Sequence, residues 1–223
     1  MSTIVDLAET VLLSWRSDGF RATARRLRER LFGEEEIFVL VRSLVPPVVP
    51  PPLPAVVNGV LVREMTAEDV DTVARILPFD LGRQPLRVRR RRLEKAMPDA
   101  FVALRGERIV GACWYWNEVT PEKPWFPAVR DHLVPPSRLT GGIFALPGER
   151  AAAWALARRA TDCLAARGVR TVVGCIGAKN RPSLLVSRLL GGKIVARQTI
   201  RYVLGRARIH VVRVDDRRPF GEP

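Results

Sequence analysis

Few side chains in this sequence have the chemistry to bind a metal ion or to form disulfides. Its cysteines, Cys113, Cys163 and Cys175, are isolated from one another, and each lies within an apolar run. The only histidines are His132 and His210. Zinc sites need cysteine or histidine ligands at short, regular spacings. The sequence therefore predicts buried structural thiols, no disulfide framework and no metal site.

Residues 139–192 are the stretch around which the rest of the chain is organised. They read as strand, tight loop, helix, strand, short loop and helix. The apolar run of residues 143–146 ends at a Pro-Gly pair, and a helical pattern with one apolar face begins directly after it. Gly168 closes this helix, and the β-branched residues 169–176 predict a buried strand. Such a unit normally makes a right-handed crossover between parallel strands.

The segments before this unit predict two helices and three strands. Thr66 and Asp69 have the spacing of a capping box at the start of a helix. Arg105, Gly106 and Glu107 join two apolar runs and predict a hairpin. The expected elements are a strand at 59–64, a helix from Thr66 to Pro78, a strongly basic helix at 86–97, and strands at 100–104 and 108–116.

The remaining segments define the predicted domain boundaries. Residues 1–44 form an extension with two helical pieces and an added strand at 37–41, and the proline-rich residues 45–58 form an extended linker. The main domain is 59–214, and a charged tail follows at 215–223. Within the domain, the proline-rich residues 119–137 predict a long surface loop, and residues 193–204 and 208–214 predict a final hairpin turning near Gly205.

Composition limits the class of protein and its partners. The 223 residues are 47% hydrophobic and 27% charged, as in ordinary globular domains. No stretch is long and apolar enough to predict a transmembrane helix, and no signal peptide is evident, so a cytoplasmic location is expected. The net charge of +14 favours acidic partners, such as phosphorylated cofactors, nucleic acid or an anionic membrane surface. Because the arginines are spread through every segment, the charge is equally consistent with a solvated surface.

The order of the elements from Gly59 to about Val214 resembles the GNAT N-acetyltransferase superfamily. GVLVREMTAEDV is similar to the usual opening strand and helix, and AFVALRGERIVGACWYW to the second and third strands. The segment AKNRPSLLVSRLLGGKIV is similar to a family pattern that includes N-x-P-A-L and ends in L-G-F. The resemblance implies an α/β (α+β) fold, with a mixed, mostly antiparallel central sheet flanked by helices.

The same resemblance implies a binding site for acetyl-CoA or another acyl-CoA, with no metal. In the family, a Q/R-x-x-G-x-G/A loop holds the coenzyme A pyrophosphate, and backbone amides at a helix N-terminus supply the donors. Arg150 and Ala155 fit this pattern, whereas Ala153 replaces the middle glycine. The implied cofactor-binding residues are Phe144, Ala145, Leu146, Arg150, Ala151, Ala152, Ala153, Trp154, Ala155 and Asn180.

The expected catalytic residues depart from the family pattern. Ser187 stands where the family has the tyrosine that protonates the leaving thiolate, and a serine hydroxyl is a weaker acid than a phenol. The strand that often supplies a glutamate as general base reads RLTGGIFAL and contains no acid. Glu118 is the leading substitute as base. Asp131 and His132 follow it as candidate bases, and Tyr115 and Tyr202 are further candidates for the acid.

The sequence thus predicts a GNAT-type acyltransferase that moves an acyl group from CoA to an amine or hydroxyl of a small molecule or polypeptide, by direct attack. The first alternative is an inactive GNAT-fold binding or regulatory protein. The second is a basic protein that binds nucleic acid or a membrane surface, although the basic helix at 86–97 lacks interleaved aromatic residues and no specific nucleic acid is expected. Peripheral membrane contact through the basic N-terminal helix, and a homodimer, stay open.

Overall fold

The computed structural model describes residues 21, 23, 24, 28, 31–45, 55–57, 59–77, 85–117, 126–204 and 206–214. The chain divides into two compact units, each built from separate stretches. The first unit includes residues 52–115 and 142–160, and the second includes residues 32–51, 116–141 and 161–223. Strand β6 (Ser137–Ala145) and helix α6 (Arg150–Ala166) contribute residues to both units.

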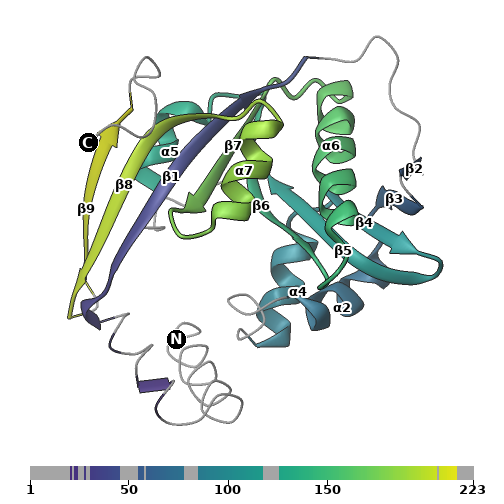
Figure 1. Cartoon of the computed structure of the whole chain (residues 1–223), viewed down its shortest axis with the longest axis horizontal. Helices are drawn as coiled ribbons and strands as arrows, with labels where there is room; N and C mark the ends of the chain where they lie inside the picture. Colours follow the sequence, from purple (N-terminus) through teal and green to yellow (C-terminus); the bar gives the residue numbers. More distant parts are fainter. Residues whose placement is uncertain are drawn as a thin grey trace. The chain divides into compact units, whose positions relative to one another are not determined.

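In the first unit, an antiparallel sheet is covered by helices on both faces. Its strands follow the order β2-β3-β4-β5, and each pairs with its neighbour in antiparallel fashion. Figure 1 shows α2 and α4 on one side of β4 and β5, and α6 on the other. The elements are β2 (Ala55–Val57), β3 (Val60–Glu64), α2 (Ala67–Ile76), α4 (Leu86–Glu94), β4 (Ala100–Arg105) and β5 (Arg108–Trp116).

Helix α2 begins with the capping box that the sequence predicts. The backbone N–H and the hydroxyl of Thr66 both donate to the carboxylate of Asp69, at 2.8 and 2.9 Å. The guanidinium of Arg63 in β3 donates to the two oxygens of the same carboxylate, at 2.5 and 2.9 Å. Burial alone would raise the pKa of Asp69, but these hydrogen bonds outweigh it and hold the pKa below its ordinary value. Asp69 therefore ties the start of α2 to the strand before it.

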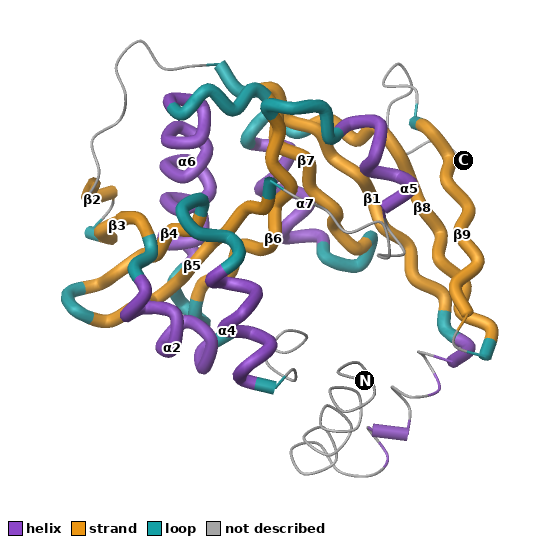
Figure 2. The backbone as a smooth tube through the Cα atoms, turned by 180° about the vertical axis from the view of Figure 1, so that it is seen from behind, coloured by secondary structure: helices purple, strands orange, loops and turns teal. Residues whose placement is uncertain are grey.

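The second unit contains five strands in the order β6-β7-β1-β8-β9. β6 and β7 are parallel, as the crossover predicts, and the other neighbours are antiparallel. The elements beside β6 are β1 (Glu34–Ser43), α5 (Phe126–Val129), the 3-10 helix η1 (Arg130–His132), β7 (Thr171–Gly177), α7 (Arg181–Leu189), β8 (Lys193–Val203) and β9 (Arg206–Arg213). Figure 2 shows β1 between β7 and β8.

The core of the second unit forms where these strands meet α5. A cluster of buried apolar side chains comes from α5 and from four strands: Val39, Ala128, Val129, Leu139, Val173 and Ala196. Trp116 and Cys175 pack against this cluster. Burial raises the pKa of the Cys175 thiol to about 12. Cys113 and Cys163 are buried, as predicted, whereas Cys175 is half-buried.

The predicted fold class is confirmed: the protein has a mixed, mostly antiparallel sheet flanked by helices. The strand read as RLTGGIFAL is β6, and the boundaries differ in detail, because α5 and η1 occupy part of the predicted 119–137 loop. Most of the N-terminal helices, most of the proline-rich linker and the tail lie outside the described residues, so the domain division stays a prediction. Among the helices that the structure describes, none has the length and apolar character needed to cross a membrane.

Candidate functional site

The turn between β6 and α6 fixes the start of the helix on which the predicted cofactor residues lie. The backbone N–H of Leu146 donates to the carbonyl of Val110 in β5 at 2.8 Å, which holds the end of β6 against β5. The N–H of Glu149 then donates to the carbonyl of Leu146 at 3.0 Å. Gly148, between them, has a φ of +87°, a conformation that favours glycine. The turn is therefore defined by backbone hydrogen bonds.

The first turn of α6 leaves two backbone donors available. The N–H groups of Ala152 and Ala153 donate to the carbonyl of Glu149, at 3.0 and 3.4 Å. The N–H groups of Arg150 and Ala151 have no acceptor among the residues that the structure describes. Such free amides carry the partial positive charge of the helix dipole, so they favour an anion. The side chain of Arg150 is exposed beside them.

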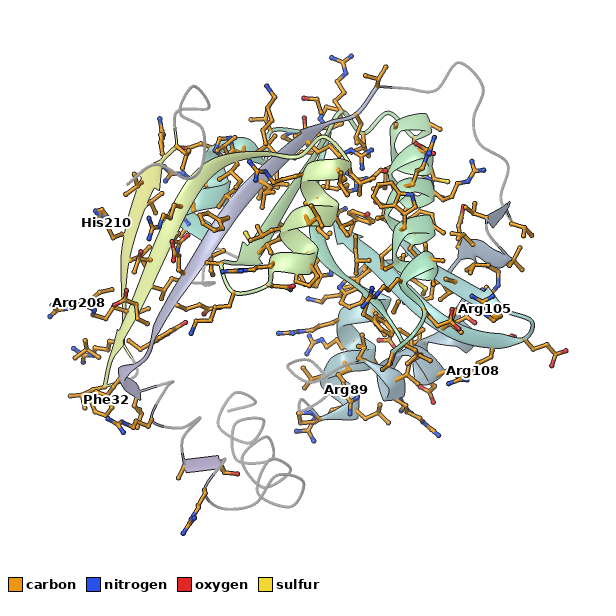
Figure 3. All side chains as sticks on the ribbon, viewed as in Figure 1. Phe32, Arg89, Arg105, Arg108, Arg208 and His210 are labelled. Atoms are coloured by element: carbon orange, nitrogen blue, oxygen red, sulfur yellow. The ribbon has the colours of Figure 1, made fainter. Side chains whose placement is uncertain are left out.

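An ion pair occupies the carboxylate of Glu149, which directly precedes α6. The guanidinium of Arg105, at the end of β4, donates to both carboxylate oxygens of Glu149, with a shortest distance of 2.8 Å. The hydrogen bond from Arg105 lowers the pKa of Glu149, and the charge of Arg108 acts in the same direction. Figure 3 shows Arg105 and Arg108 together at the β4–β5 hairpin. Because Arg105 binds this carboxylate, the free amides of the first turn remain available to a ligand.

Two glycines bring the backbones of β5 and β6 close together beside this turn. A Cβ atom at Gly111 would lie 2.8 Å from the carbonyl oxygen of Phe144 and 3.0 Å from a methyl carbon of Leu156 in α6. A Cβ atom at Gly142 would lie 2.8 Å from the indole ring of Trp114. Such separations are shorter than real Cβ contacts, so only glycine fits at either position without movement. β6 is thus held firmly at the residues that lead into the turn.

The predicted cofactor residues of this stretch all lie in the first unit, along one continuous segment. Phe144 is buried, while Ala145 and Leu146 are half-buried. In the helix, Ala152 and Ala155 face the core, and Ala153 and Trp154 are half-buried. Ala153, which replaces the expected glycine, therefore lies within the first turns of a regular helix. The structure brings these residues together as an end of strand, a turn and a helix start.

The two other predicted residues of the described chain, Asn180 and Ser187, lie in the second unit. Asn180 is the N-cap of α7, as predicted, and its side-chain oxygen accepts a hydrogen bond from the N–H of Ser183 at 3.3 Å. Ser187 is half-buried near the end of the same helix. The N–H of Gly192 donates to the carbonyl of Ser187, and a Cβ at Gly192 would lie 2.7 Å from that oxygen. This contact explains why glycine stands where the family pattern has phenylalanine.

Of the predicted bases, Glu118 lies outside the described residues. Asp131 is in η1, where it accepts hydrogen bonds from Arg130 at 3.0 Å and from Arg213 at 2.8 Å. The hydrogen bond and charge of Arg130 come first among the effects that lower the pKa of Asp131. A carboxylate held this way is a weaker base than a free one, so Asp131 is better explained as an anchor for β9. His132, next to it, is half-buried.

The two tyrosines occupy strands and take part in backbone pairing. Tyr115 is 2% exposed, and its N–H donates to the carbonyl of Asp99 at 2.9 Å. Tyr202 is half-buried, and its N–H donates to the carbonyl of Gly33 at 2.8 Å. The burial of Tyr115 indicates a structural role. Among the described residues, no group of three or more histidine, cysteine, aspartate or glutamate side chains is placed to hold a metal ion.

Helix α4 carries a dense cluster of arginines, and residues of α2 bind two of them. The guanidinium of Arg90 bonds to the carboxylate of Asp71 at 2.5 Å, and that of Arg89 donates to the carbonyl of Ala74. Burial lowers the pKa of Arg89 and of Arg92. Figure 3 shows Arg89 on this helix. The cluster is therefore partly used to pack two helices together, rather than being a fully solvated face.

Sequence reasoning missed the contribution of Arg105, Arg108 and Glu149 to this site. Arg105 and Glu149 are separated by 44 positions, and nothing in the local pattern predicts that a hairpin and a helix start would meet. The available signal was indirect: the turn Arg-Gly-Glu-Arg puts two arginines at a hairpin end, and Glu149 precedes the predicted helix.

Comparison with known proteins finds similarity to solved structures, and no similar sequence family or curated protein. No protein-family model matches the chain, and a search of curated proteins finds no match. Among solved structures, a Drosophila protein is similar with a TM-score of 0.53 at 16% identity, over 82% of this chain and 58% of its own. The Drosophila structure supports a shared fold, and at this identity nothing about activity.

Two further similar structures have TM-scores below 0.5. The first, a GCN5-related N-acetyltransferase from Sphaerobacter thermophilus, has a TM-score of 0.47 at 20% identity, over 86% of this chain and 56% of its own. The second, a tandem GNAT protein from the clavulanic acid biosynthesis pathway, has a TM-score of 0.48 at 15% identity, over 86% of this chain and 57% of its own. The chain thus spans somewhat more than half the length of each structure. GNAT proteins are thus among the solved structures to which the chain is similar, at low identity.

Proposed function

We propose that this chain binds an acyl-CoA at the start of α6 and transfers its acyl group to an amine or hydroxyl acceptor. The observation that carries the proposal is the pair of free N–H groups at Arg150 and Ala151, in the segment that the GNAT resemblance assigns to the pyrophosphate. The ion pair between Arg105 and Glu149 supports it, because it occupies the carboxylate that would otherwise repel a phosphate there.

The residues present fit a pyrophosphate at this place. Backbone donors, the exposed guanidinium of Arg150 and the nearby Arg108 supply hydrogen bonds and positive charge. Phe144, Ala145 and Leu146 offer backbone groups to the pantetheine arm, as the resemblance implies. The acyl-CoA supplies an activated thioester. Backbone N–H groups of β6 polarise its carbonyl in the manner of an oxyanion site.

The proton transfers are assigned to residues that the sequence singles out. Glu118 takes the proton of the attacking amine, and Ser187 returns a proton to the leaving thiolate, through a water. The acceptor is a small molecule or a polypeptide amine. Asn180 caps α7, which carries Ser187, and so fixes the start of that helix.

Isothermal titration calorimetry with acetyl-CoA and longer acyl-CoAs tests binding directly. Arg150→Ala should weaken binding by roughly tenfold, because one charge-assisted contact to phosphate is lost. Arg170→Ala is the matched control, since Arg170 is also exposed and lies just beyond the same helix. An absence of binding to every acyl-CoA, or an equal loss in both variants, contradicts the proposal.

A second candidate is a GNAT-fold protein that binds CoA without catalysis. The observation that favours it is that β6 contains no carboxylate and Asp131 is engaged by two arginines. Release of free thiol from acetyl-CoA, measured across a panel of amines, separates the two candidates. A chain that binds acyl-CoA but releases no thiol above background with any amine supports the binding protein.

A further inference from the structure

Strand β9 is the last strand in the sheet order, and no strand in the described part of the chain pairs with its outer side. It pairs with β8 from Ala196↔Arg213 to Val203↔Arg206 without a register shift, and all eight of its residues are exposed. Half of the N–H and C=O groups of such an edge point away from the sheet, so they can pair with another strand. β9 contains no proline or bulge, so among the usual means of blocking an edge it has only charge, which comes from its arginines and discourages pairing with a second positively charged strand.

One face of β9 continues the apolar face of the sheet. Opposite residues share a face in antiparallel pairs, so Ile209 lies beside Ile200, and Val211 beside Gln198. Ile200 is 1% exposed, whereas Ile209 is 39% exposed. The apolar side chains on this face are therefore buried in β8 and partly exposed in β9, the next strand.

The other face of β9 is basic and lacks matching carboxylates. In β8, Arg197 and Arg201 form ion pairs with Glu36 and Glu34 of β1. Arg208 lies directly opposite Arg201, and like charges in this position destabilise a sheet. Within the described part of the chain, neither Arg206 nor Arg208 has a carboxylate partner. Figure 3 shows Arg208 and His210 projecting outward from β9.

We infer that β9 is a docking site for an extended acidic polypeptide segment, which pairs with it as an additional antiparallel strand. Carboxylates of the segment lie opposite Arg206 and Arg208, and its alternate apolar side chains cover Ile209 and Val211. Charge decides between this occupant and a second copy of the chain. Of the three arginines in β9, Arg213 is paired with Asp131, whereas Arg206 and Arg208 have no carboxylate partner in the described part of the chain, so pairing two copies would double their uncompensated positive charge. An acidic strand neutralises it.

The test uses fluorescence anisotropy of the full chain with a fluorescein-labelled peptide, (Glu-Val)4. We expect saturable binding that weakens as salt rises, since exposed charges are screened. The double variant Arg206→Glu, Arg208→Glu should bind at least tenfold more weakly. Arg170→Glu, an exposed arginine outside β9, should bind like the wild-type chain. Circular dichroism of each variant checks that the fold is retained.

Two N-methylated versions of the peptide separate strand pairing from attraction between charges. Each is methylated at alternate amides, so that one version loses the N–H donors that face β9 and the other loses those that face away, and both keep every carboxylate. We expect at least tenfold weaker binding for the version that loses the donors facing β9. Equal binding of all three peptides means that only charge is sensed, and overturns the inference. Sedimentation of the chain without peptide gives a second test. A dimer that becomes a monomer in the Ile209→Lys variant also overturns the inference, because a second copy of the chain then occupies the edge of β9.

Discussion

Replacing Gly111 by alanine should destabilise the protein by pushing β6 away from β5. The new Cβ would lie 2.8 Å from the carbonyl oxygen of Phe144, 3.0 Å from Leu156 and 3.4 Å from the Cα of Ala145. Ordinary carbon–oxygen contacts are about 3.3 Å or more, so β6 must move by about half an ångström. Because the oxygen belongs to the backbone, no side-chain rotation can relieve the contact.

The expected cost is about 1–3 kcal/mol of overpacking, of which the lower chain entropy of alanine in the unfolded state offsets about 0.4–1. The net loss is then about 0.6–2 kcal/mol, and with a urea dependence of about 2 kcal/mol per molar the unfolding midpoint should fall by roughly 0.3–1 M. Urea unfolding followed by tryptophan fluorescence measures this shift. Calorimetry with acetyl-CoA should also show weaker binding, because Phe144 and Leu146 belong to the proposed site.

Gly174→Ala is the matched control for this change. Gly174 is also in a strand, but a Cβ there would meet only the hydroxyl oxygen of Thr140, at 3.9 Å. Its unfolding midpoint should stay at or slightly above that of the wild-type chain. If Gly111→Ala unfolds at the wild-type urea concentration, the close approach of β6 to β5 is refuted.

Three further outcomes follow from individual contacts. Because the pKa of Asp69 is lowered, its contribution to stability is present at neutral pH and lost as pH falls below its ordinary value of 3.8. Asp69→Asn should therefore be less stable than the wild-type chain at pH 7, by urea unfolding, and the difference between the two should shrink as the pH is lowered below 3.8. Cys175, with a pKa of about 12, should resist iodoacetamide at pH 8 in the folded chain and react in 8 M urea, as measured by mass spectrometry. Asn180→Ala should lower the unfolding free energy by about 1 kcal/mol through loss of the cap on Ser183, whereas Asn180→Asp should retain most of it.

The parts of this fold that local patterns describe were predictable from the sequence. The capping box at Thr66 and the hairpin at Gly106 involve residues only a few positions apart, so residue type and spacing specify them. The parallel pairing of β6 with β7 follows from the strand-helix-strand order. β6 and the helix that follows it, α6, carry residues 144–155 of the proposed site.

The contacts that the sequence did not predict join distant segments. The place of β1 depends on pairing with residues of β7 that follow at separations of 128 to 140 positions, and the ion pair of Arg105 with Glu149 joins a hairpin to a helix start. The fit of Gly192 against the carbonyl of Ser187 depends on how the chain leaves α7. Each is a property of the packed backbone, which periodicity and composition do not encode.

The position of β1 has a consequence for how the chain reaches this structure. β1 pairs with β7 on one side and β8 on the other, so the hairpin of β8 and β9 joins the rest of its unit through an N-terminal strand. Pairings between residues so distant in sequence form slowly, because a long loop must close first. During synthesis β1 emerges first and has no strand to pair with until the last third of the chain follows. A chain shortened at the proline-rich segment would thus lose the strand that joins its C-terminal hairpin to the sheet.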